Sequence, residues 1–170
     1  DLKNWEYLSD FGKNIGAHGG VWECPDFFEI KVQGTKETKW VLIQSLNPGG
    51  ANGGSGTQYF IGDFDGKTFT LDPNFAKKVD TEKAVWLDYG KDNYAGVTWN
   101  NIPDADGRKL FIGWMSNWDY AQVVPTTTWR SSMTIPREIQ LIKKGNDYSL
   151  ISNPVSEIDK YISKTITKKS

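Results

Sequence analysis

The chain has 170 residues, with 20 Lys and Arg against 21 Asp and Glu, so its formal net charge at pH 7 is −1. This length suits one domain with a sizeable core, or a part of a larger one. The balanced charge argues against a nucleic-acid partner, and no apolar run is long enough to span a membrane. The single cysteine excludes an internal disulfide and a metal site of several cysteines. We therefore expect neither a metal nor a cofactor.

The sequence opens on Asp1 without an initiating methionine or a signal peptide, which predicts a piece excised from a longer chain. Aromatic residues make up 14% of the chain, and 8 of them are Trp. Such a content is typical of sugar-stacking surfaces, although large β-rich cores also use these residues.

The most distinctive stretch is Trp22-Glu23-Cys24-Pro25-Asp26, which follows the flexible run Gly16-Ala17-His18-Gly19-Gly20. Pro25 fixes its own φ and restricts the preceding Cys24, and we expect Trp22 to form an aromatic wall beside Glu23. An apolar environment favours the protonated form of a carboxylic acid, which can then protonate a leaving-group oxygen. This pattern indicates the acid of a sugar-cleaving enzyme. The alternative is a surface Glu in a loop that enters a strand.

Cys24 and His18 are the only Cys and His of the chain. A catalytic pair of the two is the weaker hypothesis, because a buried Cys is more often a small hydrophobic residue. We expect His18 to be a loop residue or a substrate contact.

Alternating apolar and polar residues then predict a four-stranded antiparallel sheet. Its strands are expected at residues 27–32, 39–45, 58–64 and 67–71. Asp65-Gly66, before the last of them, is typical of a type I′ hairpin turn, which needs positive φ at both central residues.

A glycine-rich loop, from Leu46 to Thr57, joins two strands that a short turn could have linked. Long loops on rigid scaffolds often carry function, so we expect this one to form the rim of a site. A flexible linker is the alternative. The loop lacks the Gly-Lys-Ser/Thr ending that a phosphate-binding loop needs.

The pattern recurs at a spacing of roughly 70 residues, which is longer than a minimal propeller blade. Residues 95–103 echo 19–23, residues 108–116 echo 39–45, and further strands are expected at 131–135, 137–142 and 148–151. A repeated four-stranded unit predicts an all-β fold of the β-propeller type, with a β-sandwich as the alternative.

The end of the chain changes character after Asn153-Pro154. We expect residues 1–153 to form part of a propeller domain and residues 154–170 to be a linker or the start of the next module. A short amphipathic helix is expected between Val155 and Ile166, followed by a polar end.

Several motifs along the chain belong together. They are Trp22-Glu23-Cys24-Pro25-Asp26, Trp40-Val41-Leu42, residues 56–66, residues 86–95, Ile112-Gly113-Trp114-Met115-Ser116-Asn117-Trp118, Pro125-Thr126, Trp129-Arg130 and Thr134-Ile135-Pro136-Arg137-Glu138. In this order they resemble glycoside hydrolase family 32, which contains the invertases, inulinases and levanases.

The resemblance implies a five-bladed β-propeller, of which this chain holds about two to three blades, with a retaining fructosidase site in its funnel. It assigns the general acid/base to Glu23 and contact with fructose hydroxyls to Asp92. For the apolar wall it favours Trp118 over Trp114. The other substrate-binding residues that it implies are Cys24 and Tyr94.

The chain departs from the family in lacking an Asn-Asp-Pro-Asn-Gly string and an Arg-Asp-Pro string. In the family these carry the nucleophile and a transition-state stabiliser. Retention needs two carboxyl groups about 5–5.5 Å apart, so we expect this piece alone to be inactive. The parent is expected to be a β-fructofuranosidase acting on levan, inulin or sucrose, and the glycine-rich loop favours fructans. The alternatives are a non-catalytic carbohydrate-binding propeller segment and a structural fragment left by proteolysis.

Fructans lie outside the cell, so we expect the parent to be extracellular or periplasmic. An incomplete propeller exposes an apolar edge, which predicts self-association.

Overall fold

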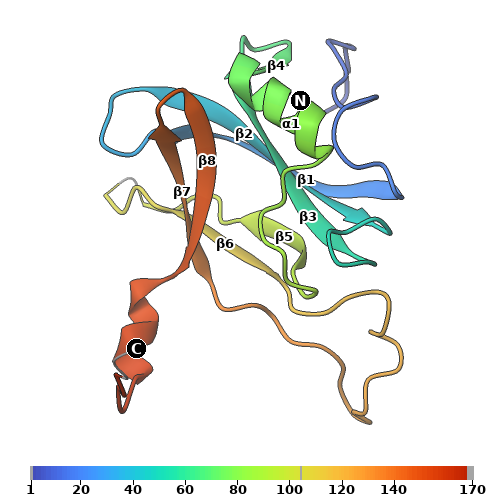
Figure 1. Cartoon of the computed structure of the whole chain (residues 1–170), viewed down its shortest axis with the longest axis vertical. Coiled ribbons are helices and arrows are strands. Elements are labelled where there is room, and N and C mark those ends of the chain that lie inside the picture. The colour runs from blue at the N-terminus through green and yellow to red at the C-terminus, as the bar shows by residue number, and fades with distance from the viewer. Residues whose placement is uncertain (1, 104, 168–170) are drawn as a thin grey trace.

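The computed structural model describes residues 2–103 and 105–167, and their strands form two four-stranded antiparallel sheets (Figure 1). Within each sheet the strands are neighbours in chain order. The first sheet contains β1 (Val21–Lys31), β2 (Thr38–Asn47), β3 (Gly56–Phe64) and β4 (Phe69–Leu71). The second contains β5 (Tyr94–Thr98), β6 (Lys109–Trp114), β7 (Arg137–Lys144) and β8 (Asp147–Pro154). The prediction of two consecutive four-stranded units is confirmed.

The opening strands of the two sheets share an irregularity. The register of β1 against β2 shifts directly after Glu23, and that of β5 against β6 directly after Tyr94. The next residue has positive φ in both cases, 50° at Cys24 and 51° at Ala95. A β-bulge bends a strand and redirects its side chains. Glu23 and Tyr94 therefore occupy equivalent positions in the two sheets.

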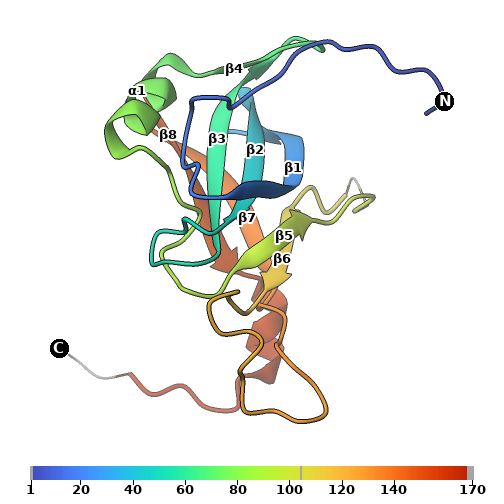
Figure 2. The same cartoon turned by 90° about the vertical axis from the view of Figure 1, so that its right-hand side faces the viewer.

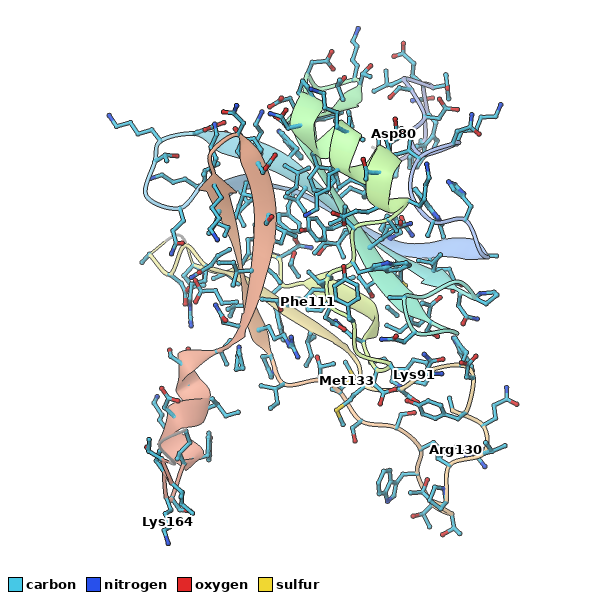
Figure 3. The ribbon with its side chains drawn as sticks, in the orientation of Figure 1. Asp80, Lys91, Phe111, Arg130, Met133 and Lys164 are labelled. Carbon is cyan, nitrogen blue, oxygen red and sulfur yellow. The ribbon has the colours of Figure 1, made fainter. Side chains whose placement is uncertain are left out.

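The two sheets share one core. Phe111 of β6 is fully buried and lies between them in Figure 3. The same core cluster contains buried residues from both sheets, among them Phe28, Val41, Ile43, Phe60, Ile61, Ile139, Leu141 and Tyr148. The chain completes one meander before it starts the next, as in propeller blades, whereas a sandwich of the immunoglobulin type exchanges strands by Greek-key connections.

The hairpin between β3 and β4 is confirmed, but its turn is not of type I′. Only Gly66 of the Asp65-Gly66 pair has positive φ, at 92°. The Asp65 carboxylate instead accepts hydrogen bonds from the N–H groups of Lys67 at 2.8 Å and Thr68 at 2.7 Å. The side chain thus closes the turn in place of a second left-handed residue.

One helix, α1 (Pro73–Glu82), was not predicted from the sequence. Asp72 caps it by accepting from the N–H groups of Asn74 at 3.0 Å and Phe75 at 3.2 Å, and Pro73 occupies the first turn. Phe75 packs into the shared core. The helix therefore covers one end of the core, close to β4 and β8 (Figure 1).

Three other expectations need correction. Residues 131–135 do not form a strand, because only Met133 in this segment pairs with β6, in an isolated bridge to Trp114. The continuous pairing of β6 with β7 covers residues 109–111 of β6. The alignment of 95–103 with 19–23 is wrong, since Ala95 corresponds to Cys24 at the bulge. The helix after residue 154 is a single 3₁₀ segment, η1 (Ser156–Tyr161), with no buried residue.

Both η1 and the long segment between β6 and β7 project from the sheets at the same end of the molecule (Figures 1 and 2). The domain boundary at residue 153 stays a prediction.

Within the described ranges, neither α1 nor η1 has the length and apolarity that a membrane-spanning helix requires.

Candidate active site

Trp22 and Glu23 are neighbours on β1, so their side chains point to opposite faces of the sheet. The Trp22 ring stacks on His18 at a centroid distance of 4.9 Å and contacts Phe60 at 5.5 Å. Its Nε1–H donates to the carbonyl oxygen of Ala17 at 2.8 Å. Glu23 is exposed on the other side. The expected wall of Trp22 beside Glu23 is therefore wrong.

The partner of Glu23 is Tyr94, which opens the second sheet. The Tyr94 hydroxyl donates a hydrogen bond to Oε2 of Glu23. Tyr94 is only 4% exposed, and its burial, followed by the bond to the Glu23 carboxylate, raises the pKa of its hydroxyl well above the ordinary value. The phenol therefore stays protonated at neutral pH and donates to Glu23.

The backbone around Glu23 is fixed as well. Gln44 of β2 is buried and donates from Nε2 to the carbonyl oxygen of Glu23 at 2.6 Å. Beyond the bulge, Asp26 accepts from the N–H of Thr98 in β5 through Oδ2, also at 2.6 Å. β1 and β5 are thus joined on both sides of the bulge, which holds Glu23 at the junction of the sheets.

Cys24 is exposed at the bulge, so it is not a small hydrophobic residue buried in the core. Its positive φ and the following Pro25, which offers no N–H to the strand pair, both suit a bulge. The His18 ring lies on Trp22, on the face opposite Glu23. This arrangement argues against a Cys24–His18 catalytic pair.

The rings of Tyr94, Trp114 and Trp118 contact one another in sequence. The rings of Tyr94 and Trp114 lie 6.3 Å apart between centroids at 61°, and those of Trp114 and Trp118 lie 5.1 Å apart at 55°. Trp114 is half-buried, whereas Trp118 is 48% exposed. Four of the residues predicted from the sequence therefore form one continuous group, which runs from Glu23 to Trp118 and ends in an aromatic face open to a ligand.

Asp92 precedes this group by two residues and is exposed. Its two neighbours are fixed: the carbonyl oxygen of Lys91 accepts from Nδ2 of Asn117 at 2.8 Å, and Asn93 is buried. The backbone thus presents the Asp92 carboxylate on an exposed bend that leads directly into Tyr94.

The glycine-rich loop between β2 and β3 borders the aromatic group. The N–H of Trp118 donates to Oγ of Ser55 at 3.1 Å, and Ser55 in turn donates to Oδ1 of Asn47 at 3.1 Å. Asn117 also contacts this loop and was not predicted as a site residue. The signal available was an amide placed between Trp114 and Trp118 in a motif already noted for its aromatics.

The described part of the chain contains no group of three or more His, Cys, Asp or Glu side chains that could hold a metal ion. A cavity of about 540 Å³ lies away from Glu23, where residues 30–36, 107–109 and 138–141 line it. None of the predicted site residues borders this cavity. The chemistry that Glu23 and its neighbours can supply is proton transfer at an exposed carboxyl group beside a sugar-stacking surface.

A model of the glycosyl hydrolases family 32 N-terminal domain matches residues 1–154. The levanase of Bacillus subtilis (strain 168) is 48% identical over 160 residues, which are 94% of this chain and 23% of that protein. The extracellular exo-inulinase of Aspergillus niger is 45% identical over 156 residues, which are 91% of this chain and 28% of that protein.

Solved structures are similar over the same part. The crystal structure of exo-inulinase from Aspergillus awamori has a TM-score of 0.79 at 41% identity, over 91% of this chain and 29% of that one. The fructofuranosidase from Schwanniomyces occidentalis complexed with fructose has a TM-score of 0.76 at 38% identity, with the same coverage. The chain thus spans less than a third of the length of these relatives.

Proposed function

The chain belongs to glycoside hydrolase family 32, its two sheets are blades of a β-propeller, and we propose that the full-length protein hydrolyses terminal β-fructofuranosyl residues of levan, inulin or sucrose. The similarity to a levanase and to exo-inulinases supports this activity and favours fructans over sucrose. Because some of the relatives are named as extracellular, we also propose that the full-length protein is exported.

One observation supports the assignment of the acid/base: Glu23 is an exposed carboxyl group on a bulge, oriented by the buried hydroxyl of Tyr94, whose pKa is raised. In a double displacement, Glu23 would first give its proton to the glycosidic oxygen while a carboxylate outside this chain attacks the anomeric carbon. The Glu23 carboxylate would then take a proton from water, which attacks the fructosyl–enzyme bond and releases fructose.

The neighbouring residues supply the binding surface in this proposal. Trp118 offers an exposed ring for the apolar face of fructose, and the ring of Trp114 packs against it. Asp92 would accept hydrogen bonds from fructose hydroxyls on its exposed bend. Cys24 lies next to Glu23 and would line the same pocket.

The test is fructose release by the full-length protein and by its Glu23→Gln variant. Gln keeps the size of the side chain but has no proton to give, so kcat should fall by about 10²–10⁴-fold while KM changes little. Azide should restore product formation from a substrate whose leaving group needs no protonation, because the anion replaces the activated water. The matched control is Glu29→Gln, which changes another exposed Glu of β1 and should leave kcat unchanged.

A full-length protein that binds fructan without releasing fructose would support the non-catalytic carbohydrate-binding module instead. Equal kcat values for the wild type and the Glu23→Gln variant would contradict the acid/base role. Self-association through an open propeller edge stays a prediction.

A further inference from the structure

Asn117 is a fully buried amide at the meeting point of three loops. It lies on the segment that follows β6, directly before Trp118. The glycine-rich loop before β3 and the bend that carries Asp92 before β5 both contact it. The hydrogen bonds of this one side chain therefore connect all three loops.

Both the amide nitrogen and the amide oxygen of Asn117 form hydrogen bonds with backbone groups. Nδ2 donates to the carbonyl oxygen of Lys91 at 2.8 Å, and it lies 3.3 Å from the carbonyl oxygens of Gly53 and Ser55. Oδ1 accepts from the N–H of Ser55 at 3.2 Å and from that of Asp119 at 3.0 Å. A primary amide has two donor hydrogens and two acceptor lone pairs, so its hydrogen-bonding capacity is fully used.

Further contacts hold the same three loops together. Trp118 donates its N–H to Oγ of Ser55, and Lys91 forms an ion pair with Asp119 at 2.8 Å. The ion pair is about half exposed and adds little by itself. The buried amide is the stronger constraint, because breaking its bonds would leave several backbone groups unsatisfied in the interior.

Gly54 shows how closely the glycine-rich loop approaches this amide. Its φ is +62°, and a Cβ at this position would lie 2.0 Å from Oδ1 of Asn117 and 2.6 Å from Cγ of Asp119. No residue with a Cβ fits there without displacing the amide or the loop. The glycine-rich loop therefore packs closely against Asn117, which argues against the alternative that it is a flexible linker.

We propose that Asn117 is a positioning residue that holds Trp118, the Asp92 bend and the glycine-rich loop as one rigid wall and thereby sets the affinity for the terminal fructosyl unit. The proposal rests on the proposed function. Because Asn117 is fully buried, it acts through the residues that its hydrogen bonds hold in place. Glu23 lies on β1 and is held by Gln44 and Tyr94, so the acid/base should be left in place when Asn117 is changed.

The test is the steady-state kinetics of the full-length protein with Asn117→Ala. Loss of the buried bonds should release Trp118 and Asp92, and KM for fructan should rise by about tenfold to a hundredfold, each tenfold step being about 1.4 kcal/mol of binding. kcat should change much less, because Glu23 keeps its partners. Asn117→Asp keeps the shape and the acceptor oxygen but removes the donors, and it should raise KM in the same direction if the Ala variant does not fold.

The matched control is Gln58→Ala. Gln58 is also a fully buried amide with two backbone hydrogen bonds, but both go to Ala17 on the Trp22 face of the sheet. Its loss should lower the melting temperature without raising KM. A rise in KM of the same size in this control would overturn the proposal, because it would make the effect of Asn117 a general loss of stability.

A double-mutant cycle with Gly54→Ala tests the contact itself. Gly54→Ala alone should raise KM, since its Cβ displaces the amide. In the Asn117→Ala background the same change should cost clearly less, because residues in contact are coupled. Strictly additive effects would contradict the proposal.

Hydrogen exchange separates the failure of this inference from the failure of the proposed function. In the Asn117→Ala variant, residues 48–55 and 86–93 should lose protection together, a result that needs no enzymatic activity. A wild type without fructose release would remove the proposed function but leave this readout. An active wild type whose Asn117→Ala variant keeps its KM and its protection would overturn the inference.

Discussion

The two sheets are joined by two tyrosine–glutamate hydrogen bonds that differ in their surroundings. In one, Tyr94 at the start of β5 donates to Glu23 on β1. In the other, Tyr148 on β8 donates to Glu37 in the turn between β1 and β2. Both tyrosines are 4% exposed, and burial is the largest cause of the raised pKa of each hydroxyl. In both hydrogen bonds, a buried tyrosine hydroxyl is thus the donor and a glutamate carboxylate is the acceptor.

The charges around the acceptors are not alike. Glu37 also forms a salt bridge with Lys143 at 3.1 Å, and the ammonium groups of Lys143 and Lys39 lie 4.7 Å and 5.2 Å from the centre of the Tyr148 ring. The bond from Tyr148, followed by that from Lys143, lowers the pKa of Glu37 below its ordinary value. Glu23 forms no salt bridge with any other described residue.

This difference indicates how one type of contact serves two purposes. A carboxylate with a cationic partner is held in its charged form and fastens the sheets together. A carboxyl group oriented by a neutral hydroxyl and without a cationic partner suits the acid/base role proposed for Glu23, because such a group must give and take protons.

The larger expected effect comes from removing the two hydroxyls in turn. Tyr94→Phe in the full-length protein should lower kcat by about tenfold to a hundredfold, because a hydrogen bond to a charged group, worth about 1.5–3 kcal/mol, no longer orients Glu23. Tyr148→Phe should leave kcat unchanged and lower the melting temperature. Fructose release and thermal unfolding of both variants check this pair, and equal losses of kcat would contradict the comparison.

A smaller effect is expected in the pH dependence of stability. The folded-state pKa of Glu37 is depressed, so its contribution is present above the unfolded value of about 4.3 and is lost as the pH falls through the lower folded-state value. Melting temperatures of the wild type and of Glu37→Gln should therefore converge as the pH is lowered from about 6 to about 3, in the range where a carboxyl group titrates. A constant difference across this range would show that the Glu37 charge does not fasten the sheets.

Much of the strand pattern could be predicted because period-two alternation is a local property. The expected strands at 39–45 and 137–142 lie within β2 and β7. The same alternation should have shown that Trp22 and Glu23 face opposite ways. Asp72-Pro73, an N-cap before a proline, was an available signal for α1.

The geometry of the candidate site could not be predicted in this way. Positive φ at Cys24 and Ala95 is imposed by the bulges, and neither residue type indicates it. The contact of Glu23 with Tyr94 joins residues 71 positions apart and depends on how the sheets pack. A buried amide such as Asn117 looks like any polar loop residue until its backbone partners are known.

The most direct test of the role of Glu23 is a crystal structure of the full-length Glu23→Gln variant with an intact fructan oligosaccharide. If Glu23 is the acid/base, the side chain at position 23 should lie about 2.6–3.2 Å from the glycosidic oxygen, the reach of a general acid. This side chain should also keep its hydrogen bond with Tyr94, and the fructosyl ring should lie against Trp118. A glycosidic oxygen out of reach of position 23, with another carboxyl group beside it, would contradict the acid/base role of Glu23.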